Sequence, residues 1–343
     1  MHQRHVIDFP HRKAGHCATG SLRDLLSFKK LSVGLAPLGE GPVFGLGGGL
    51  AFTYLEMPGM NPPLYIVGRG ASLEAFACRN LGIKAVLRQT ADSEEGWEWV
   101  RAAVAHGEPT MVWADIKHLE YLRVRMHNTM HAIVITGYDA GLGVAYVADN
   151  DRSEIQQCTF ESLARARNSD AFPGPNRHAT WLLQFPEQLP DAETMIVAGV
   201  AEAVRNMRIP GDTTSLGGHS GLSGLDAFAA AYATWPERFN DDLGAAMWGL
   251  DVLITKAGTG GALFRSLFAD FLLWAGDVLS APALHAAGSH YAYIATLWRT
   301  LAEGPHSHGC PTVAEIVRAE HDGVKMQEAW LGSQPGTLVS RRV

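Results

Sequence analysis

The sequence predicts an α+β region followed by an all-α domain, and two observations carry this prediction. Up to about residue 187, short apolar runs of strand length interleave with amphipathic stretches of helical period, and the last strand runs follow one another closely, as in an antiparallel sheet. Beyond Pro186 and Pro190 the strand pattern stops, and alanine- and leucine-rich stretches with helical spacing continue almost to the end of the chain.

The same patterns place the elements along the chain. In the first part, strands are predicted at residues 64–67, 85–87, 110–114, 130–137, 143–149, near 155 and at 181–185, and helices at 17–30, 72–81, 93–105 and from 159. In the second part, helices are predicted at 192–208, 222–234, 239–257, 262–280, 283–302 and 311–331. Since 343 residues suffice for two domains, we expect a first domain at 1–187, a helical domain at 188–335 and a flexible tail at 336–343.

Residues 43–52, VFGLGGGLAF, form a glycine-dense segment that reads as a loop entering a strand. The segment does not fit a phosphate-binding loop, because it lacks a Gly-Lys-Ser/Thr ending and the dinucleotide glycine spacing, and no helix signal follows directly. We therefore expect these glycines to allow close approach of another backbone segment or of a ligand.

The composition excludes several classes of partner. The net charge is −7 and no apolar run approaches the roughly 18 residues of a membrane span, so we expect neither nucleic acid nor a membrane as partner. The four cysteines are too few and too dispersed for a disulfide framework, and the polar N-terminus has no signal-peptide core. The predicted location is therefore the cytoplasm.

The first 30 residues differ from this overall balance. They carry six basic residues against two acidic ones, a local charge of +4. One interpretation is an ordinary solvated face, since scattered surface charge is the norm. The other is a docking face for an anionic partner.

Gly15, His16 and Cys17 precede an apolar run with helical spacing. A cysteine at a helix N-terminus lies where the helix dipole and free backbone N–H groups favour a thiolate, and a thiolate attacks carbonyl carbons. A lone cysteine is more often a buried structural residue, so this position needs partners before it indicates a nucleophile.

Two further residues are placed by the hairpin at residues 130–149. If its five-residue connection centres on Ala140, paired positions sum to 280, and His131 lies directly opposite Asp149 on one face of the sheet. A carboxylate so placed can orient the imidazole and stabilise its charged form. Alone, the histidine could be a core residue and the aspartate a turn former, and a one-residue slip in register would separate them.

The order of these residues and the motifs around them resemble a known family. A cysteine that begins a helix, then a histidine that opens a strand, then an acid one hairpin later is the chain order of papain-type enzymes. The motifs GHC, VFGLGGGLAFTY and HAIVITGYD…YVAD, with KAGTGGALFRSLFADFL at residues 256–272, resemble the BtrH-like acyltransferase family of butirosin biosynthesis over roughly residues 10–335. The hairpin is more distantly similar to that of bacteriocin-processing cysteine peptidases.

The resemblance implies a papain-like cysteine peptidase/transglutaminase-type fold with a helical C-terminal domain that binds the acceptor. It also implies an amide-forming acyltransferase of antibiotic biosynthesis. Cys17 would accept an acyl group from an acyl carrier protein and pass it to a small-molecule amine, with His131 and Asp149 completing the catalytic triad. No tightly bound cofactor is expected, because the carrier protein delivers the phosphopantetheine thioester. A homodimer stays open.

Other roles are less defined. The Cys17 amide is the expected oxyanion donor, and His11, His16, Gly47 and Gly48 are further candidates for oxyanion or substrate binding. Arg265, in the motif at residues 258–264 and just beyond, could close on the active site, bind a phosphate, or form an interdomain salt bridge. We expect no metal site, because His306, His308 and Cys310 lack the paired second half of a zinc site.

The sequence is also consistent with two alternatives to acyl transfer. The first is a cysteine peptidase, amidase or thioesterase that uses the same triad with water as acceptor. The second is a non-catalytic binding or scaffold protein that has kept the fold.

Overall fold

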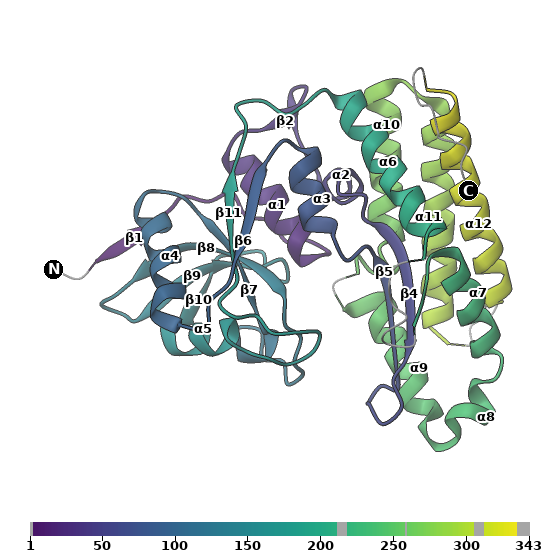
Figure 1. Cartoon of the computed structure of the whole chain (residues 1–343), viewed down its shortest axis with the longest axis horizontal. Helices are drawn as coiled ribbons and strands as arrows, with labels where there is room; N and C mark the ends of the chain where they lie inside the picture. The colour runs from purple at the N-terminus through teal and green to yellow at the C-terminus, as the bar shows by residue number, and fades with distance from the viewer. Residues whose placement is uncertain (1–2, 211–217, 258, 305–311, 335–343) are drawn as a thin grey trace. The chain divides into compact units, whose positions relative to one another are not determined.

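The computed structural model describes residues 3–210, 218–257, 259–304 and 312–334 (Figure 1). The chain divides into two compact units, the first of Met1–Glu40 and Gly82–Leu189, the second of Gly41–Leu81 and Pro190–Val343. Residues 41–81, which we expected in the first domain, therefore belong with the helical residues. The predicted tail at 336–343 and the residues from His306 to Cys310 lie outside the described part of the chain.

Strand pairing explains why residues 41–81 join the second unit. β4 (Leu50–Glu56) and β5 (Leu64–Arg69) form an antiparallel hairpin, and β12 (His219–Ser220) pairs with the free edge of β4. The sheet order β12-β4-β5 thus ties an early hairpin to a segment that follows α6 (Ala192–Arg208). Apolar periodicity cannot predict a pairing between segments so distant in sequence.

The first unit is built on a seven-stranded antiparallel sheet (Figure 1). Its order is β10-β9-β8-β7-β11-β6, and β1 pairs with β8 outside this path. The strands are β1 (Arg4–Val6), β6 (Lys84–Arg88), β7 (Thr110–Ala114), β8 (His131–Asp139), β9 (Val144–Ala148), β10 (Gln156–Thr159) and β11 (Thr180–Gln184). A separate two-stranded ribbon joins β2 (Ser32–Val33) and β3 (Ala36–Pro37). Together with the helices, this confirms the predicted α+β class.

Helices cover this sheet and close its core. α1 (Cys17–Phe28) contacts β8, α4 (Ser93–Ala105) contacts β8 and β7, and α5 (Phe160–Arg167) contacts β7. One apolar cluster joins α4, α5 and strands β7 to β10, with Val100, Ile133 and Leu163 among its buried members. Burial of this kind stabilises the sheet by roughly 25 cal/mol per Å² of apolar surface.

The β8–β9 hairpin does not have the register that the sequence predicted. Paired positions sum to 283 near the turn, as in Tyr138 with Ala145, and to 282 beyond an irregularity between Ile135 and Gly137, as in Val134 with Ala148. The predicted pairing of His131 with Asp149 is therefore wrong. The turn is shorter than predicted, because β8 extends to Asp139 and β9 begins at Val144.

The irregularity is a β-bulge, and it decides which side chains share a face. If the register near the turn continued, Asp149 would lie opposite Val134, on the other face from His131. The bulge shifts the pairing by one residue, so the continued ladder places Asp149 opposite Ile133, two positions from His131 on the same face. The core confirms the shift, since Ile133, Ile135 and Tyr138 belong to one buried cluster although their positions do not share parity.

The second unit is mainly helical. Its helices are α2 (Glu40–Leu46, whose first residue belongs to the first unit), α3 (Leu73–Asn80), α6 (Ala192–Arg208), α7 (Gly221–Tyr232), α8 (Trp235–Phe239), α9 (Leu243–Asp251), α10 (Arg265–Leu279), α11 (Pro282–Ala302) and α12 (Val313–Gly332). Its aromatic core includes Phe52, Phe228 and Trp298, whose ring centroids lie about 6 Å apart. The described part of the predicted all-α region is thus helical apart from the short strand β12, and it shares its unit with the β4–β5 hairpin.

Three predicted boundaries in this unit are wrong for local reasons. The helix expected at 239–257 is broken, because Asn240 has a φ of 43° and a five-residue π turn follows Asp251. The helix expected from 262 begins at Arg265, since Leu263 and Phe264 both have positive φ. Residues 43–46, expected in a loop, belong to helix α2.

No helix in the described ranges is long and apolar enough to cross a membrane.

Candidate active site

Cys17 is the first residue of helix α1, and the sequence around it fixes that position. His16 is the N-cap, and its Nδ1 accepts a hydrogen bond from the Thr19 amide at 3.4 Å. The Glu40 carboxylate accepts hydrogen bonds from the amides of Gly15 and His16 at 2.9 and 2.8 Å. The first amides of a helix have no partner within it, so the Cys17 N–H is available at the place where the thiol lies.

The loop before Cys17 is held against the segment that follows β9 and carries Asp149. The Ala14 amide donates to the Asn150 carbonyl at 2.9 Å, and Asn150 Nδ2 donates to the Ala14 carbonyl at 3.2 Å. Gly20 allows α1 to come this close, because a Cβ at that position would lie 2.5 Å from the Ala14 Cβ. Cys17 and Asp149 therefore belong to one closely packed part of the first unit.

His131 and Asp149 form a buried pair. His131 Nε2 lies 3.1 and 3.0 Å from the two carboxylate oxygens of Asp149. Asp149 is fully buried, and the His131 side chain is 10% exposed. The side chains thus meet as the sequence predicted, although through the bulged register and not through direct pairing.

The electrostatics of Cys17 favour a thiolate. Burial alone would raise the pKa of this thiol, but the neighbouring His16 and the hydrogen bond with His131 outweigh burial and hold the pKa well below the usual range for cysteine. The other two described cysteines differ, since burial raises the pKa of Cys78 to about 12 and that of Cys158 to about 12. Cys17 is therefore the described cysteine whose surroundings favour the thiolate.

The two partners show the complementary shifts. Burial disfavours the imidazolium, but the Asp149 carboxylate and Cys17 together raise the pKa of His131 well above its usual value. Burial also disfavours the Asp149 carboxylate, but His131, the Asp151 amide and Tyr121 lower its pKa below the usual value. The three residues therefore favour a thiolate–imidazolium pair supported by an ionised carboxylate.

Tyr121 is a member of this site that the sequence did not indicate. Its hydroxyl donates to Asp149 Oδ2 at 2.8 Å, while its ring packs against the buried cluster of the first unit. The residue lies in the irregular segment between a short 3₁₀ turn (Ile116–His118) and β8, where no periodicity or motif marks it. Only the folded chain brings it to the carboxylate.

Two parts of the chain match models of known protein families. Residues 16–150 match the family model described as Butirosin biosynthesis protein H, N-terminal, and residues 161–322 match a model described as Domain of unknown function (DUF4872). Residues 16–150 thus form an N-terminal domain of the butirosin biosynthesis protein H family, followed by a DUF4872 domain. A comparison with curated proteins finds no match.

The match to the butirosin biosynthesis protein H family covers the whole site. It begins at His16, the residue before Cys17, and ends at Asn150, the residue after Asp149. Tyr121 and His131 also lie inside it. The resemblance seen in the sequence motifs is therefore confirmed.

Two histidines near Cys17 in sequence have different surroundings. His16 caps α1 and contributes to the low pKa of Cys17. His11 is bound elsewhere, with Nδ1 2.8 Å from Asp24 Oδ2 and Nε2 3.0 Å from the Arg152 carbonyl. Because both ring nitrogens of His11 are engaged, the geometry does not support it as an oxyanion donor.

Gly47 and Gly48 belong to the second unit, and their amides are already bonded. The Gly47 amide donates to Val43 O at 3.1 Å and the Gly48 amide to Gly45 O at 2.8 Å. Gly48 has a φ of +58°, and a Cβ there would lie 2.3 Å from Glu202 Cγ. Gly47 and Gly48 thus end helix α2 and allow Glu202 to pack closely within the second unit. Both amides are already bonded, so neither is left to bind an oxyanion.

Arg265 has a structural environment in the second unit. Its guanidinium is fully buried, with Nε 2.7 Å from Glu320 Oε1 and Nη1 donating to the carbonyls of Ala51, Gly68 and Leu263. A phosphate or substrate role for Arg265, considered from the sequence, does not fit this buried position. The ion pair lies within one unit, so it is not interdomain.

Among the described residues, three side chains that could bind a metal ion lie close together. One ligand atom from each of Asp115, His118 and His127 lies within 4.8 Å of the others. The Asp115 carboxylate already accepts from His127 Nδ1 at 2.6 Å and Ser169 Oγ at 2.7 Å, and the Lys117 ammonium lies 2.8 Å from His127 Nε2. This hydrogen-bond network holds the segment before His131. A metal ion bound there would have to displace the Lys117 ammonium from His127.

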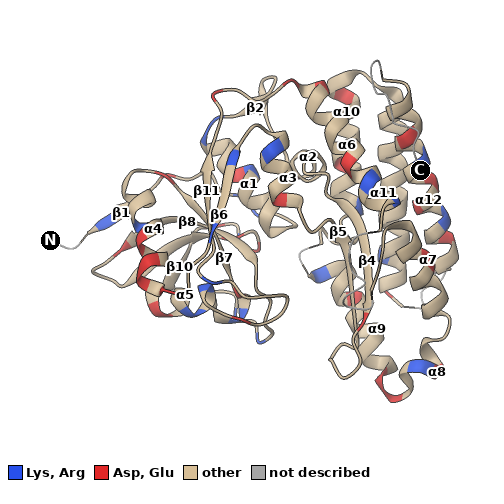
Figure 2. Cartoon of the chain, viewed as in Figure 1, with Lys and Arg blue, Asp and Glu red and all other residues tan. Residues whose placement is uncertain are grey.

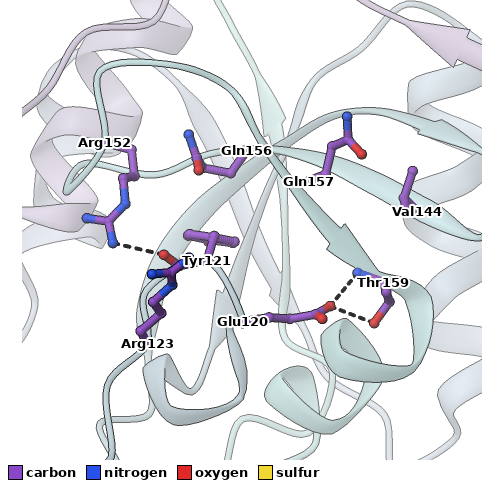
Figure 3. A pocket seen from close by; sticks show the side chains of 8 residues that line it. All are labelled: Glu120, Tyr121, Arg123, Val144, Arg152, Gln156, Gln157 and Thr159. Carbon is purple, nitrogen blue, oxygen red and sulfur yellow. Dashed lines mark hydrogen bonds between the residues drawn. The ribbon is translucent and has the colours of Figure 1, made fainter.

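A pocket of about 620 Å³ lies beside the triad in the first unit (Figure 3). Figure 3 shows Arg123 and Arg152 reaching toward Tyr121 at one end of it. Arg152 Nη2 donates to the Tyr121 carbonyl at 2.9 Å. Tyr121 therefore both lines the pocket and donates a hydrogen bond to the Asp149 carboxylate. Its lining residues are Glu120, Tyr121, Arg123, Val144, Arg152, Gln156, Gln157 and Thr159.

Proposed function

We propose that this protein is a cysteine-dependent acyltransferase that transfers an acyl group from a carrier-protein thioester to an amine. The observation that carries the proposal is the half-buried Cys17 thiol, whose pKa His16 and His131 lower, together with the pair of His131 and Asp149. Membership of the butirosin biosynthesis protein H family supports a role in antibiotic biosynthesis. The order of helix-borne cysteine, strand-borne histidine and following acid supports the papain-like class.

The proposed reaction has two balanced steps. The Cys17 thiolate attacks the thioester carbonyl, a new C–S bond forms to Cys17, and the carrier thiolate leaves and takes the proton of the His131 imidazolium. The acceptor amine then attacks the Cys17 thioester, neutral His131 takes the amine proton, and Cys17 leaves as a thiolate. Asp149 holds the imidazole and stabilises its charged form in the first and last states.

The oxyanion of both tetrahedral intermediates needs a donor. We assign this role to the Cys17 amide, because it is the first amide of α1 and the helix dipole favours negative charge there. The helical second unit remains our proposal for binding the acceptor. Three free cysteines among the described residues support a reducing compartment, which we take to be the cytoplasm.

Intact-mass analysis tests the proposal. The protein is incubated with a panel of carrier proteins that bear different acyl groups, and we expect one acyl adduct on Cys17 that persists until an amine is added. The Cys17→Ala variant should form no adduct. Loss of the adduct in buffer alone at the rate seen with amine would establish a hydrolase, and unchanged biosynthetic output with Cys17→Ala would establish a scaffold.

A further inference from the structure

The structure changes the interpretation of the basic N-terminal segment. Three of its six cations are neutralised, since Arg4 pairs with Asp139, Arg23 with Asp24, and Lys29 with Glu108. Arg12 and Lys13 remain exposed in the loop before Cys17. Figure 2 shows basic and acidic residues interspersed along the first unit, so a cationic surface has to come from side chains without acidic partners.

Hydrogen bonds place these two cations beside other basic residues. His11 Nε2 lies 3.0 Å from the Arg152 carbonyl, so the chain at residues 11–13 runs next to Arg152. The Arg152 guanidinium in turn donates to the carbonyls of Tyr121 and Leu122. Hydrogen bonds thus link the segment that carries Arg12 and Lys13 to Arg152, and Arg152 to the residues just before Arg123. Arg123 and Arg152 also line the same pocket. We call the cations of these segments the basic strip: Arg12, Lys13, Arg123, Arg125 and Arg152.

Most of the basic strip is not neutralised. Arg12, Lys13, Arg123 and Arg125 form no ion pair within the described part of the chain. Arg152 pairs with Asp151. The nearby Glu120 carboxylate is committed to the amide and hydroxyl of Thr159, at 2.8 and 2.6 Å.

Apolar side chains lie between the cations of the loop. Residues 123–126 read Arg-Val-Arg-Met, and all four are exposed, with Val124 at 38% and Met126 at 52%. A mixed surface of unpaired arginines, a valine and a methionine suits a protein partner that presents carboxylates around apolar groups. Such a surface is a poor match for a nucleic-acid backbone, which the chain's net charge of −7 also repels.

The loop is anchored to the triad at both ends. At its start, the Tyr121 hydroxyl binds Asp149 at 2.8 Å. At its end, Asn128 N donates to Asp115 Oδ1 at 3.0 Å, and β8 then opens with His131, which pairs with Ala114 of β7. A partner on residues 123–126 would therefore lie at the same end of the sheet as the reacting thiol.

We infer that the basic strip, with Val124 and Met126, is the docking surface for the acidic carrier protein that delivers the thioester. The inference rests on the proposed function, in which the donor is tethered to a protein that must bind beside Cys17. Acidic carrier carboxylates would pair with Arg123 and Arg125, and the strip continues to Arg12 and Lys13 beside Cys17. Charge pairs at the rim of an interface speed encounter and are screened by salt.

The test compares two donors and two charge-reversal variants. The variant Arg123→Glu/Arg125→Glu is matched by Lys30→Glu/Lys84→Glu, which makes the same charge change at exposed positions of the first unit outside the strip. Each protein is assayed with the acylated carrier and with the free acyl-pantetheine thioester. Binding of the unacylated holo-carrier is measured by fluorescence anisotropy at low and high salt, and circular dichroism checks folding.

We expect the strip variant to lose about 10-fold or more in carrier affinity and in kcat/KM for the carrier donor. Its reaction with the free thioester should match that of the unmodified protein, and the matched control should keep both activities. Two results would overturn the inference. The strip variant could bind the carrier as tightly as its control, or it could lose equal activity with the carrier donor and with the free thioester. If the unmodified protein reacts with neither donor, the acyl-transfer proposal fails, and the binding measurement still decides the surface.

Discussion

At the scale of single residues, reactivity depends on what surrounds each cysteine. Burial raises the pKa of Cys78 and of Cys158, whereas His16 and His131 overcome burial at Cys17 and lower its pKa. His131 needs Asp149 for this, because an isolated buried imidazole would stay neutral. The proposed nucleophile therefore depends on neighbours that come from a loop, a strand and a strand end.

Tyr121 is the residue where this dependence can be tested. Tyr121→Phe keeps the ring but removes the hydrogen bond to Asp149, a charged-group bond worth about 1.5–3 kcal/mol. We expect kcat to fall about 10-fold with little change in KM, as for a residue that positions another. Tyr121 helps to lower the pKa of Asp149, so removing its hydroxyl should raise that pKa. As the pH is lowered, the variant should therefore lose activity at a higher pH than the unmodified protein.

The pH–rate profile of Tyr121→Phe measures both effects. Tyr146→Phe, on the neighbouring strand β9, removes a hydroxyl that is not part of the site and serves as control. An unchanged acidic limb for Tyr121→Phe would show that the hydroxyl does not act on Asp149.

At the scale of secondary-structure elements, two features align the triad. The bulge in β8 brings Asp149 to the face of His131, and the absence of a side chain at Gly20 lets α1 approach Ala14. Both act through backbone geometry. A substitution that keeps the side chains of the proposed triad can therefore still move Cys17 away from His131.

Gly20→Ala tests the second feature. Its Cβ would lie 2.5 Å from Ala14 Cβ and 3.5 Å from Asn150 Cβ, so we expect a loss of about 1–3 kcal/mol in the free energy of unfolding, despite the better helix propensity of alanine. The alkylation rate of Cys17 should also fall. Gly244→Ala adds a Cβ with nothing within 4 Å and should cost nothing in urea unfolding. Equal stability of the two variants would contradict the close-packing argument.

At the scale of the whole molecule, the chain forms two units that interleave in sequence. The first unit carries the whole triad, and the second closes around the buried Arg265–Glu320 pair, to which Trp298 Nε1 also donates at 2.8 Å. The long motif around Arg265 therefore serves the stability of the helical unit. This explains a strong sequence signature that contributes no group to the triad.

Arg265→Met should leave Glu320 buried and unpaired, which we expect to cost about 3–5 kcal/mol of stability. The double variant Arg265→Met/Glu320→Met should recover part of that loss. Arg208→Met breaks the exposed pair with Glu328 in the same unit and should cost about 1 kcal/mol or less. Urea unfolding followed by tryptophan fluorescence compares them, and equal costs for Arg265→Met and Arg208→Met would refute the structural role.

The sequence by itself determined the features that follow from local chemistry. Apolar periodicity placed most helices and strands, including α4 and α6 at their observed ends, and the α+β class followed from their order. A cysteine at a predicted helix start and two polar residues in one hairpin, together with the family resemblance, selected Cys17, His131 and Asp149 for the proposed triad. These signals depend on residues close together in the chain.

Tertiary structure decided everything that depends on distant segments or on backbone irregularity. The bulge in β8 could not be predicted because it leaves no periodic signal, yet it sets the face of Asp149. Tyr121 meets Asp149 28 positions later in the chain, and β4 meets β12 more than 150 positions later, through contacts that only folding creates. Local composition predicted the elements and the reactive groups, while register, burial and charge neutralisation emerged from packing.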